Sequence, residues 1–249
     1  MAHGDRLVIA AIPARWGSTR FPGKPLALLA GEPMIAHVVR RAAEARSIDA
    51  VVVATDDERV AAAAAAAGAE VVMTGACASG TDRVAEAVLG REGWEIVVNV
   101  QGDEPRIAAR NIDALVAGMV AAPEVGIATL CRPLDPERVS DPNAVKVVRS
   151  ATGRALYFSR SPLPYPRDPE AARRLWLLHL GIYGFRRAAL ASFVELPPSP
   201  LERAEGLEQL RALENGMEIL VLDAPRPAFG VDTPEDLAEL ERLLGSSRR

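Results

Sequence analysis

The segment from Pro13 to Pro25 holds the side chains best suited to bind a polyanion. It places Arg15, Arg20 and Lys24 in one loop, together with two hydroxyl side chains and two glycines. Glycine lets backbone N–H groups approach a ligand closely, and several cations together can neutralise a polyphosphate. This composition favours a triphosphate site, and a solvated basic loop is the alternative on composition alone.

The same segment departs from the common phosphate-binding motifs. Five residues separate Gly17 from Gly23, one more than in the Walker A motif, and Pro25 stands where that motif needs a magnesium-binding Ser or Thr. The dinucleotide motif G-x-G-x-x-G is also absent from the chain. These departures disfavour P-loop ATPases and kinases and the usual Rossmann dehydrogenases.

Two aspartates are candidate metal ligands. Asp103 follows the apolar run 96–100, and Asp232 directly precedes a helix start at Thr233. Magnesium in enzymes is commonly held by one or two carboxylates plus phosphate oxygens. We therefore expect Asp103 to be a Mg²⁺ ligand. Asp232 is a second candidate, for which helix capping is the favoured explanation on the residues alone.

Composition excludes several classes of protein. The chain has 249 residues, 49% of them hydrophobic, which is enough for a real core. Its net charge of −4 gives no basic excess for a nucleic-acid partner. It has no long apolar run for a membrane span and no signal-peptide pattern, so we expect a cytoplasmic protein. Two distant cysteines and three histidines offer no zinc cluster or disulfide framework.

The first half of the chain alternates apolar strands with helical segments. This pattern predicts the α/β fold class, with a mainly parallel central sheet and helices on both faces. Ligands of such sheets bind beyond the carboxyl ends of the strands, where Pro13, Asp56 and Asp103 fall. We expect strands at 7–12, 50–54, 70–73, 96–100 and 125–130, and helices from 34, over 57–67, over 81–89 and near 110–121.

The pattern changes after residue 131. A hairpin around Gly153 joins 144–148 to 155–158, and a strand follows at 179–185. The later elements are a helix over 201–214, a strand over 218–222 and a C-terminal helix capped by Thr233. We expect one α/β domain over residues 1–249 with an inserted antiparallel lobe at about 132–200.

Taken together, the motifs resemble those of the 3-deoxy-manno-octulosonate (Kdo) cytidylyltransferases, the CMP-Kdo synthetases, in order from about residue 7 to 244. Besides the segments above, the resemblance rests on 79–83, 143–148, 155–160, 179–184, 200–202 and 207–211. It implies a nucleotide-diphospho-sugar transferase fold, usually a homodimer, in which the lobe at about 132–200 serves sugar binding and dimerisation. The implied reaction joins CTP and Kdo to give CMP-Kdo and pyrophosphate for lipopolysaccharide synthesis, with Mg²⁺ as cofactor.

The resemblance also assigns roles to individual residues. The catalytic set would be Arg15, Lys24, Asp103 and Asp232, of which Asp103 and Asp232 hold the metal. The nucleotide would be bound by Ala14, Arg15, Arg20, Lys24, Ser79, Gly80, Thr81, Arg83 and Gln101. The sugar would be bound by Gln101, Arg160, His179, Tyr183, Glu208 and Gln209.

The chain departs from the family pattern beside these residues. The segment 74–78 is one residue shorter than usual and lacks the Asp-His pair that commonly precedes Ser79. Two other functions remain open: a cytidylyltransferase for another acidic sugar, such as amino-Kdo or a sialic acid, and a non-catalytic protein that binds nucleotide.

Overall fold

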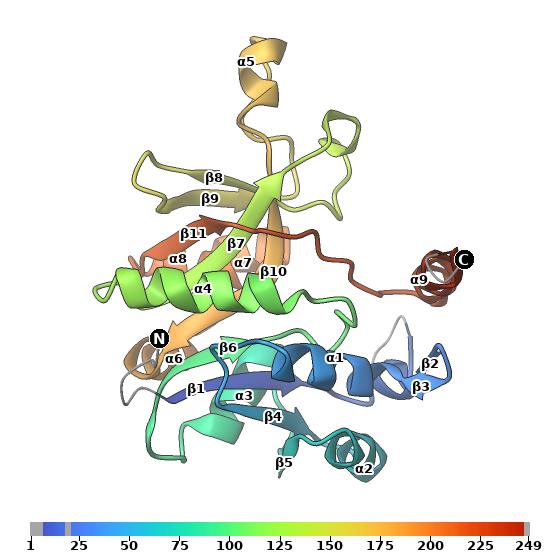
Figure 1. The fold of residues 1–249 in the computed structure, drawn as a ribbon. Helices are drawn as coiled ribbons and strands as arrows, with labels where there is room; N and C mark the ends of the chain where they lie inside the picture. Colours follow the sequence, from blue (N-terminus) through green and yellow to red (C-terminus); the bar gives the residue numbers. More distant parts are fainter. Residues whose placement is uncertain (1–6, 18–20, 247–249) are drawn as a thin grey trace. The chain divides into compact units, whose positions relative to one another are not determined.

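A computed structural model describes residues 7–17 and 21–246 (Figure 1). The chain divides into two compact units. Unit 1 comprises Met1–Asp113 and Arg226–Arg249, and unit 2 comprises Ala114–Pro225. The chain therefore leaves unit 1 once and returns to it.

Unit 1 is built on four parallel strands. Their order is β6-β1-β4-β5, and the central strand is completely buried at Ala10, Ala11 and Ile12. Short β-branched and alanine-rich runs suit strands covered on both faces. The strands are β1 (Leu7–Pro13), β4 (Ala50–Thr55), β5 (Glu70–Met73) and β6 (Trp94–Asn99).

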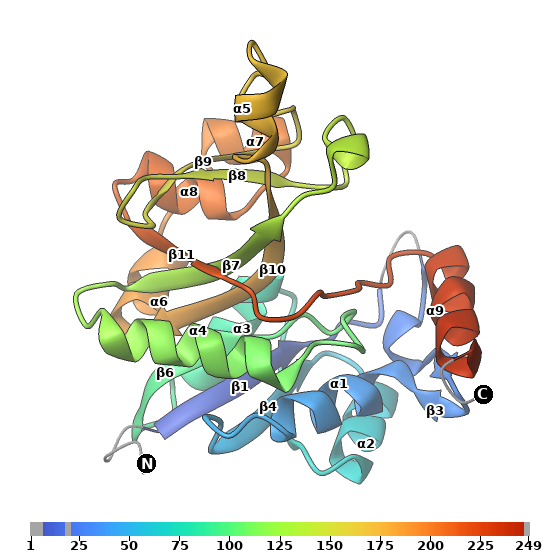
Figure 2. The same ribbon diagram turned by 45° about the horizontal axis from the view of Figure 1, so that its top comes forward.

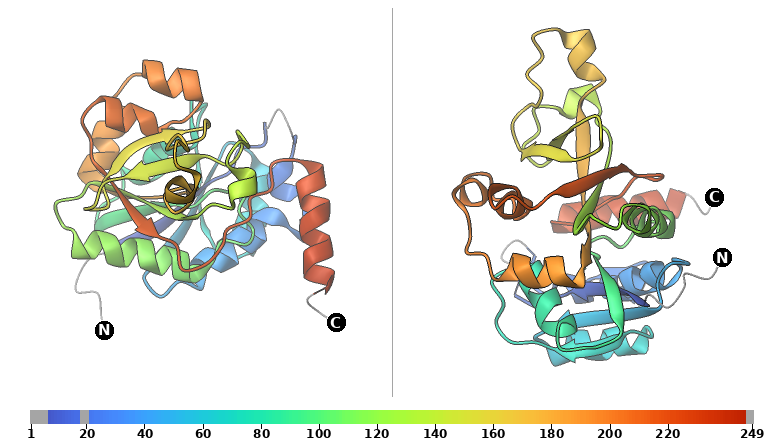
Figure 3. Two further views of the ribbon diagram at one scale, coloured as in Figure 1. Left: turned by 90° about the horizontal axis from the view of Figure 1, so that it is seen from above. Right: turned by 90° about the vertical axis from the view of Figure 1, so that its left-hand side faces the viewer.

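Helices cover both faces of this sheet. The helices α1 (Met34–Ala43) and α2 (Glu58–Ala66) contact each other, and α3 (Gly80–Val88) lies on the opposite face (Figure 3). Right-handed crossovers produce this arrangement, because the chain moves one way through β4 and β5 and returns through α3 to β6. The remaining elements of unit 1 are the 3₁₀ turn η1 (Lys24–Leu26), β2 (Leu28–Leu29), β3 (Glu32–Pro33) and α9 (Pro234–Ser246).

The last segment of the chain returns to unit 1 through a small apolar cluster. Leu29, Met34, Val231 and Leu240 are buried together in it. Thr233 caps α9, because its hydroxyl accepts a hydrogen bond from the backbone N–H of Asp236 at 3.2 Å. This packing fixes residue 232 close to the rest of unit 1.

Unit 2 has a mixed sheet in the order β11-β7-β10-β8-β9 (Figure 2). Only β11 and β7 pair in parallel, and the other pairs are antiparallel. The strands are β7 (Ile127–Pro133), β8 (Lys146–Arg149), β9 (Ala155–Ser159), β10 (Leu177–Arg186) and β11 (Ile219–Asp223). The helical elements are η2 (Pro136–Arg138), α5 (Pro169–Arg173), α6 (Arg187–Val194), α7 (Pro200–Glu205) and α8 (Gln209–Glu214). Helix α4 (Ala109–Ala121) begins in unit 1 and ends in unit 2.

The predicted fold class is confirmed by the parallel, helix-covered sheet of unit 1 and the antiparallel strands of unit 2. The prediction of a single helix over 201–214 is wrong. Gly206 adopts a left-handed conformation with φ of 61° and ends α7, and α8 then begins at Gln209. Glycine adopts this conformation at little cost, so it commonly terminates helices.

No helix in the described part of the chain has the length and apolar character needed to cross a lipid bilayer.

Candidate active site

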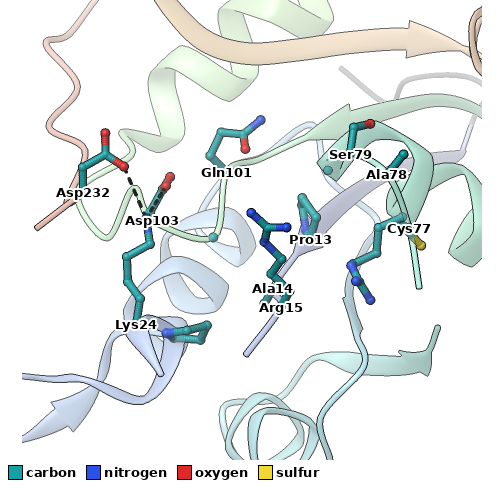
Figure 4. Close-up of a pocket in the computed structure, with 14 residues that line it drawn as sticks. Pro13, Ala14, Arg15, Lys24, Cys77, Ala78, Ser79, Gln101, Asp103 and Asp232 are labelled. Carbon is teal, nitrogen blue, oxygen red and sulfur yellow. Dashed lines mark hydrogen bonds and ion pairs between the residues drawn. The ribbon is translucent and has the colours of Figure 1, made fainter. Parts of the chain in front are cut away.

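A cavity of about 290 Å³ in unit 1 lies at the carboxyl ends of its parallel strands (Figure 4). Its walls come from the loop after β1, the turn η1, the loop before α3, the loop after β6 and the segment before α9. The residues predicted for nucleotide or metal binding that line it are Ala14, Arg15, Lys24, Ser79, Gly80, Arg83, Gln101, Asp103 and Asp232. Of the other two, Thr81 is not a lining residue, and Arg20 lies outside the described residues.

Backbone hydrogen bonds extend the sheet into these loops. The N–H of Ala14 donates to the carbonyl of Ala54 at 2.9 Å, one residue past β1. The N–H of Val100 donates to the carbonyl of Ala11 at 2.9 Å, one residue past β6. The site loops therefore leave the sheet in fixed directions.

Of two glycines that pack against Pro13, one is needed for the site loops to approach each other. A Cβ on Gly102 would lie 2.7 Å from the carbonyl oxygen of Pro13, which is closer than carbon and oxygen can pack. A Cβ on Gly80 would lie 3.4 Å from Cγ of Pro13, an ordinary contact. Gly102 is thus required by the close packing of the loops after β1 and β6.

Lys24 brings the two predicted metal ligands together. Its Nζ lies 2.7 Å from Oδ2 of Asp103 and 3.5 Å from Oδ1 of Asp232. It also donates to the carbonyl of Val231 at 3.1 Å, and the N–H of Val231 donates to the carbonyl of Asp103 at 2.8 Å. These bonds hold the segment before α9 against the loop after β6.

This pair of carboxylates fits a magnesium ion. Asp103 and Asp232 offer hard oxygen donors, their side chains are 33% and 51% exposed, and both line the cavity. The described residues contain no group of three or more His, Cys, Asp or Glu side chains that could hold a metal alone. A two-carboxylate set is typical of Mg²⁺ that also binds substrate phosphates.

Glu104, the neighbour of Asp103 in the chain, has a shifted pKa that sequence reasoning missed. Burial, followed by the neighbouring Asp103 carboxylate, raises the pKa of Glu104 to about 8. The side chain is therefore largely protonated and neutral at pH 7. Two adjacent carboxylates in the sequence already suggest that one pKa is raised. The main cause of the shift at Glu104 is burial, however, and burial can be known only from the fold.

The shortened segment before Ser79 is held by charged side chains of α3. Arg83, only 3% exposed, donates to Oδ2 of Asp56 at 2.9 Å, to the carbonyl of Gly75 at 3.3 Å and to the hydroxyl of Thr74. On this evidence its guanidinium braces a wall of the cavity. The predicted contact of Arg83 with the nucleotide stays a prediction.

Glu86 braces the same segment from the next turn of α3. Its carboxylate accepts from the N–H of Gly75 at 2.8 Å and from Sγ of Cys77 at 3.1 Å. Burial, with help from the Glu86 hydrogen bond, raises the pKa of Cys77 to about 11, so this thiol stays protonated. Sequence reasoning missed Glu86 because its contacts lie nine and eleven residues away.

The first turn of α3 shows why Thr81 is not a lining residue. Ser79 caps the helix by accepting from the N–H of Asp82 at 3.1 Å. Thr81 is 3% exposed, and its hydroxyl accepts from the amide of Asn99 at 3.1 Å. Thr81 therefore ties α3 to β6.

The residues predicted to bind the sugar belong to unit 2, except for Gln101. Three N–H groups of the Arg160 guanidinium donate to main-chain carbonyls: those of Glu205 at 2.7 Å, Pro142 at 2.8 Å and Gly206 at 3.3 Å. The guanidinium is therefore held rigidly. A planar guanidinium has five donors, which leaves donors for a carboxylate.

His179 and Tyr183 lie side by side on β10. The register of β10 against β7 shifts between Leu180 and Tyr183, and the two rings are 5.4 Å apart. Burial lowers the pKa of His179 to about 3, and its Nε2 lies 3.0 Å from the hydroxyl of Thr129. Burial, then the charge of Glu208, raises the pKa of Tyr183. Both rings are uncharged at neutral pH.

Gln209 is buried at 7% exposure, and its Nε2 has no hydrogen-bond partner among the described residues. A buried donor without a partner is costly. A ligand oxygen would satisfy it.

Residues 9–219 match the model of a family described as cytidylyltransferase. The chain belongs to this cytidylyltransferase family. The 3-deoxy-manno-octulosonate cytidylyltransferase of an Anaeromyxobacter species is 53% identical over 98% of this chain and 99% of its own length. The protein of the same description from Myxococcus xanthus is 49% identical over 95% of this chain and 96% of its own. The resemblance inferred from the motifs is confirmed, and the chain is a nucleotidyltransferase.

One solved structure agrees with this assignment, and a second shares the fold. One described as CMP:2-keto-3-deoxy-manno-octonic acid synthetase complexed with CTP has a TM-score of 0.92 and 43% identity, covering 97% of this chain and 99% of its own. A 4-diphosphocytidyl-2C-methyl-D-erythritol synthase from Anaerococcus prevotii has a TM-score of 0.65 at 11% identity, over 97% of this chain and 99% of its own. At that identity, the second structure shows the fold alone.

Proposed function

We propose that this chain transfers CMP from CTP to the anomeric hydroxyl of Kdo, giving CMP-Kdo and pyrophosphate. The observation that carries the proposal is the cavity in which Lys24, Asp103 and Asp232 meet at the carboxyl edge of a parallel sheet. Relatives described as Kdo cytidylyltransferases match nearly the whole chain, and the related structure that contains CTP supports the nucleotide.

The chemistry is an in-line displacement at the α-phosphorus. The bond from the sugar oxygen to phosphorus forms while the bond to the β-phosphate oxygen breaks, the hydroxyl proton is released, and pyrophosphate leaves. The protein contributes little covalent chemistry to this reaction. Catalysis therefore comes mainly from positioning the reactants and stabilising the negative charge of the phosphates. Mg²⁺ on Asp103 and Asp232 would polarise the phosphates and stabilise the leaving group.

Several residues of the cavity are suited to binding the triphosphate. Arg15 and Lys24 supply positive charge to the triphosphate, and Arg20 is assigned the same role by resemblance. Ser79 and Gly80 line the cavity at the N-terminus of α3, and a helix N-terminus favours anions.

The sugar-side residues act through hydrogen bonds and one charge. Arg160 supplies a cation for the carboxylate of the sugar acid. His179 and Tyr183 are uncharged near neutral pH, so they offer hydrogen bonds to hydroxyl groups. The unpartnered Nε2 of Gln209 is a ready donor for a sugar oxygen, and Glu208 is an acceptor.

The finer assignments come from the family resemblance. We propose a Mg²⁺-dependent homodimer that works in the cytoplasm and serves lipopolysaccharide synthesis. Light scattering on the purified protein checks the assembly. A mass of twice the 26.5 kDa of one chain is expected, and a monomer at assay concentration contradicts it.

The decisive experiment measures pyrophosphate release from CTP and Mg²⁺. Kdo, amino-Kdo, a sialic acid and no sugar are compared, because a few buried hydrogen-bonding groups separate such sugars. Release with Kdo above the others supports the proposal. Faster pyrophosphate release with another sugar would identify that sugar as the substrate instead of Kdo. CTP binding without pyrophosphate release for any sugar would favour a non-catalytic nucleotide-binding protein.

We predict that Asp103→Asn lowers turnover by at least about 100-fold, because it removes a metal ligand while keeping the shape of the side chain. The unfolding temperature should change little, since the side chain is one-third exposed. Glu92→Gln, at an exposed position, is the matched control. Near-normal turnover in well-folded Asp103→Asn protein would remove Asp103 from the mechanism.

A further inference from the structure

A second cavity in unit 1, of about 430 Å³, shares no lining residue with the nucleotide cavity. We call it the arginine cavity. Its walls are the end of α1, the segment before α4, and the segment that returns from unit 2. Arg41, Arg106, Ile107, Arg226 and Phe229 are the lining residues that matter below.

The charge of the arginine cavity is entirely positive. Three arginines and no acidic residue line it, although the whole chain carries a net charge of −4. Arg41 forms an exposed ion pair with Glu44 at 2.9 Å on its own helix. Among the described residues, the guanidinium groups of Arg106 and Arg226 have no acidic partner.

A buried side chain fixes one of these arginines in place. Asn111, fully buried, donates to the carbonyl of Arg226 at 2.9 Å and accepts from its N–H at 2.9 Å. This reciprocal pair attaches the returning segment to the first turn of α4. On the other wall, the N–H of Ile107 donates to the carbonyl of Glu104 at 3.0 Å, which makes a tight turn around Arg106.

The start of α4 runs against the usual charge preference of helices. No acidic residue occupies the first turn, and Arg106 lies just before the helix. Cations near a helix N-terminus are unfavourable, and a bound anion would offset that cost. Local rules broken in this way tend to mark functional sites.

We propose that the arginine cavity binds an oligophosphate anion at a site separate from the nucleotide cavity. Guanidinium groups bind phosphate oxygens in bidentate fashion, and three of them suit more than one phosphate group. The cavity volume is within the range of small-molecule sites. The apolar walls at Ile107 and Phe229 strengthen the attraction by lowering the local dielectric.

The anion has two possible sources, free pyrophosphate or the phosphates of a nucleotide. Equilibrium binding of labelled pyrophosphate, without metal or sugar, is measured with CTP absent and at saturation. Free pyrophosphate as the ligand predicts about one bound per chain at saturating CTP. A nucleotide as the ligand predicts two CTP per chain in a parallel titration.

The variant Arg106→Gln/Arg226→Gln should weaken this second binding event by at least about 10-fold. Arg106→Lys/Arg226→Lys should lose less, because the charge remains. Arg110→Gln removes the same charge from a residue outside the cavity lining and should change binding less than twofold. The unfolding temperature of all three variants should equal that of the parent protein, since the substituted side chains are exposed.

Three results would overturn the proposal: displacement of all pyrophosphate by a single equivalent of CTP, unchanged binding in the double glutamine variant, or an equal loss in Arg110→Gln. The last result would reduce the effect to general surface charge. The activity of the enzyme is not needed for any of these readings.

Discussion

The side chain of Arg160 is held in one conformation by hydrogen bonds to the main chain. Its guanidinium is held by three carbonyls, and its own carbonyl accepts a hydrogen bond from Nζ of the buried Lys146. A cation fixed in this way loses little side-chain entropy when it binds a carboxylate.

We predict that Arg160→Ala raises the KM for the sugar by at least about 10-fold while the KM for CTP changes less than about threefold. The lost hydrogen bonds to carbonyls should also cost about 1–3 kcal/mol of unfolding free energy. Steady-state kinetics with each substrate varied in turn checks the first point. Equal increases for both substrates would show that Arg160 is not the carboxylate anchor.

His179 predicts a pH dependence of stability. Because burial lowers its pKa from 6.5 to about 3, the unfolded chain binds a proton at this residue below pH 6.5 while the folded protein does not until about pH 3. The stability contributed by neutral His179 is therefore present above pH 6.5 and lost as pH falls toward 3, by at most about 1.4 kcal/mol per pH unit.

Denaturant unfolding at pH 7, 6, 5 and 4 tests this with His179→Gln, which cannot take up a proton. The variant should lose less stability than the parent between pH 6.5 and 4. Parallel curves for the two proteins would contradict the assignment.

How far the sequence predicts the site depends on how local each contact is. Lys24, Asp103 and Asp232 belong to motifs that stand out in the sequence. Glu86 resembles an ordinary exposed helix residue, and only the packing of α3 shows that it holds Gly75 and Cys77. Motif reasoning finds residues that line the cavity, whereas the residues that hold its loops in place can be identified only from the tertiary structure.

At the level of secondary-structure elements, the loops after β1 and β6 can pack together only because residue 102 is glycine. We predict that Gly102→Ala lowers the unfolding free energy by about 1–3 kcal/mol and weakens CTP binding, because its Cβ would meet the backbone oxygen of Pro13 at 2.7 Å. Calorimetric titration of CTP and thermal unfolding measure the two effects.

Gly80→Ala is the matched control, because Gly80 packs against the same residue, Pro13, from the start of α3. Its Cβ makes only a 3.4 Å contact with Pro13, and alanine in α3 improves helix propensity. Its unfolding temperature should not fall. A Gly102→Ala protein as stable as the parent would show that the loops can separate without cost.

The sequence predicts the types of the helices and strands well. It fails at one place, where it predicts a single helix and the structure has two. Alternating apolar strands and helices gave the parallel sheet of unit 1 and the hairpin of β8 and β9. The apolar spacing over 201–214 is compatible with one helix, but Gly206 lies within it and reverses the sign of φ. Periodicity alone does not reveal where a glycine uses its conformational freedom.

For the whole molecule, the return of the chain to unit 1 couples its last helix to the candidate active site. We predict that Leu240→Ala, at a fully buried position, costs about 2–5 kcal/mol and raises the Mg²⁺ concentration needed for half-maximal activity. The reason is that α9 begins two residues after Asp232.

Leu243→Ala is the control on the same helix, because its side chain is 40% exposed. It should cost less than about 1 kcal/mol and leave the Mg²⁺ requirement unchanged. Urea unfolding and a magnesium titration of initial rates measure both variants. Equal losses for the two leucines would show that α9 does not position Asp232 through its apolar cluster.

Unit 1 is discontinuous in the chain, and this matters during synthesis on the ribosome. Asp103 and Lys24 emerge early, whereas Asp232 emerges only after Ala114–Pro225 has been translated. At roughly 5–20 residues per second, that interval is on the order of ten seconds. The nascent protein therefore completes its pair of carboxylates last, and it exposes the apolar residues Leu29 and Met34 until Val231 and Leu240 arrive to cover them.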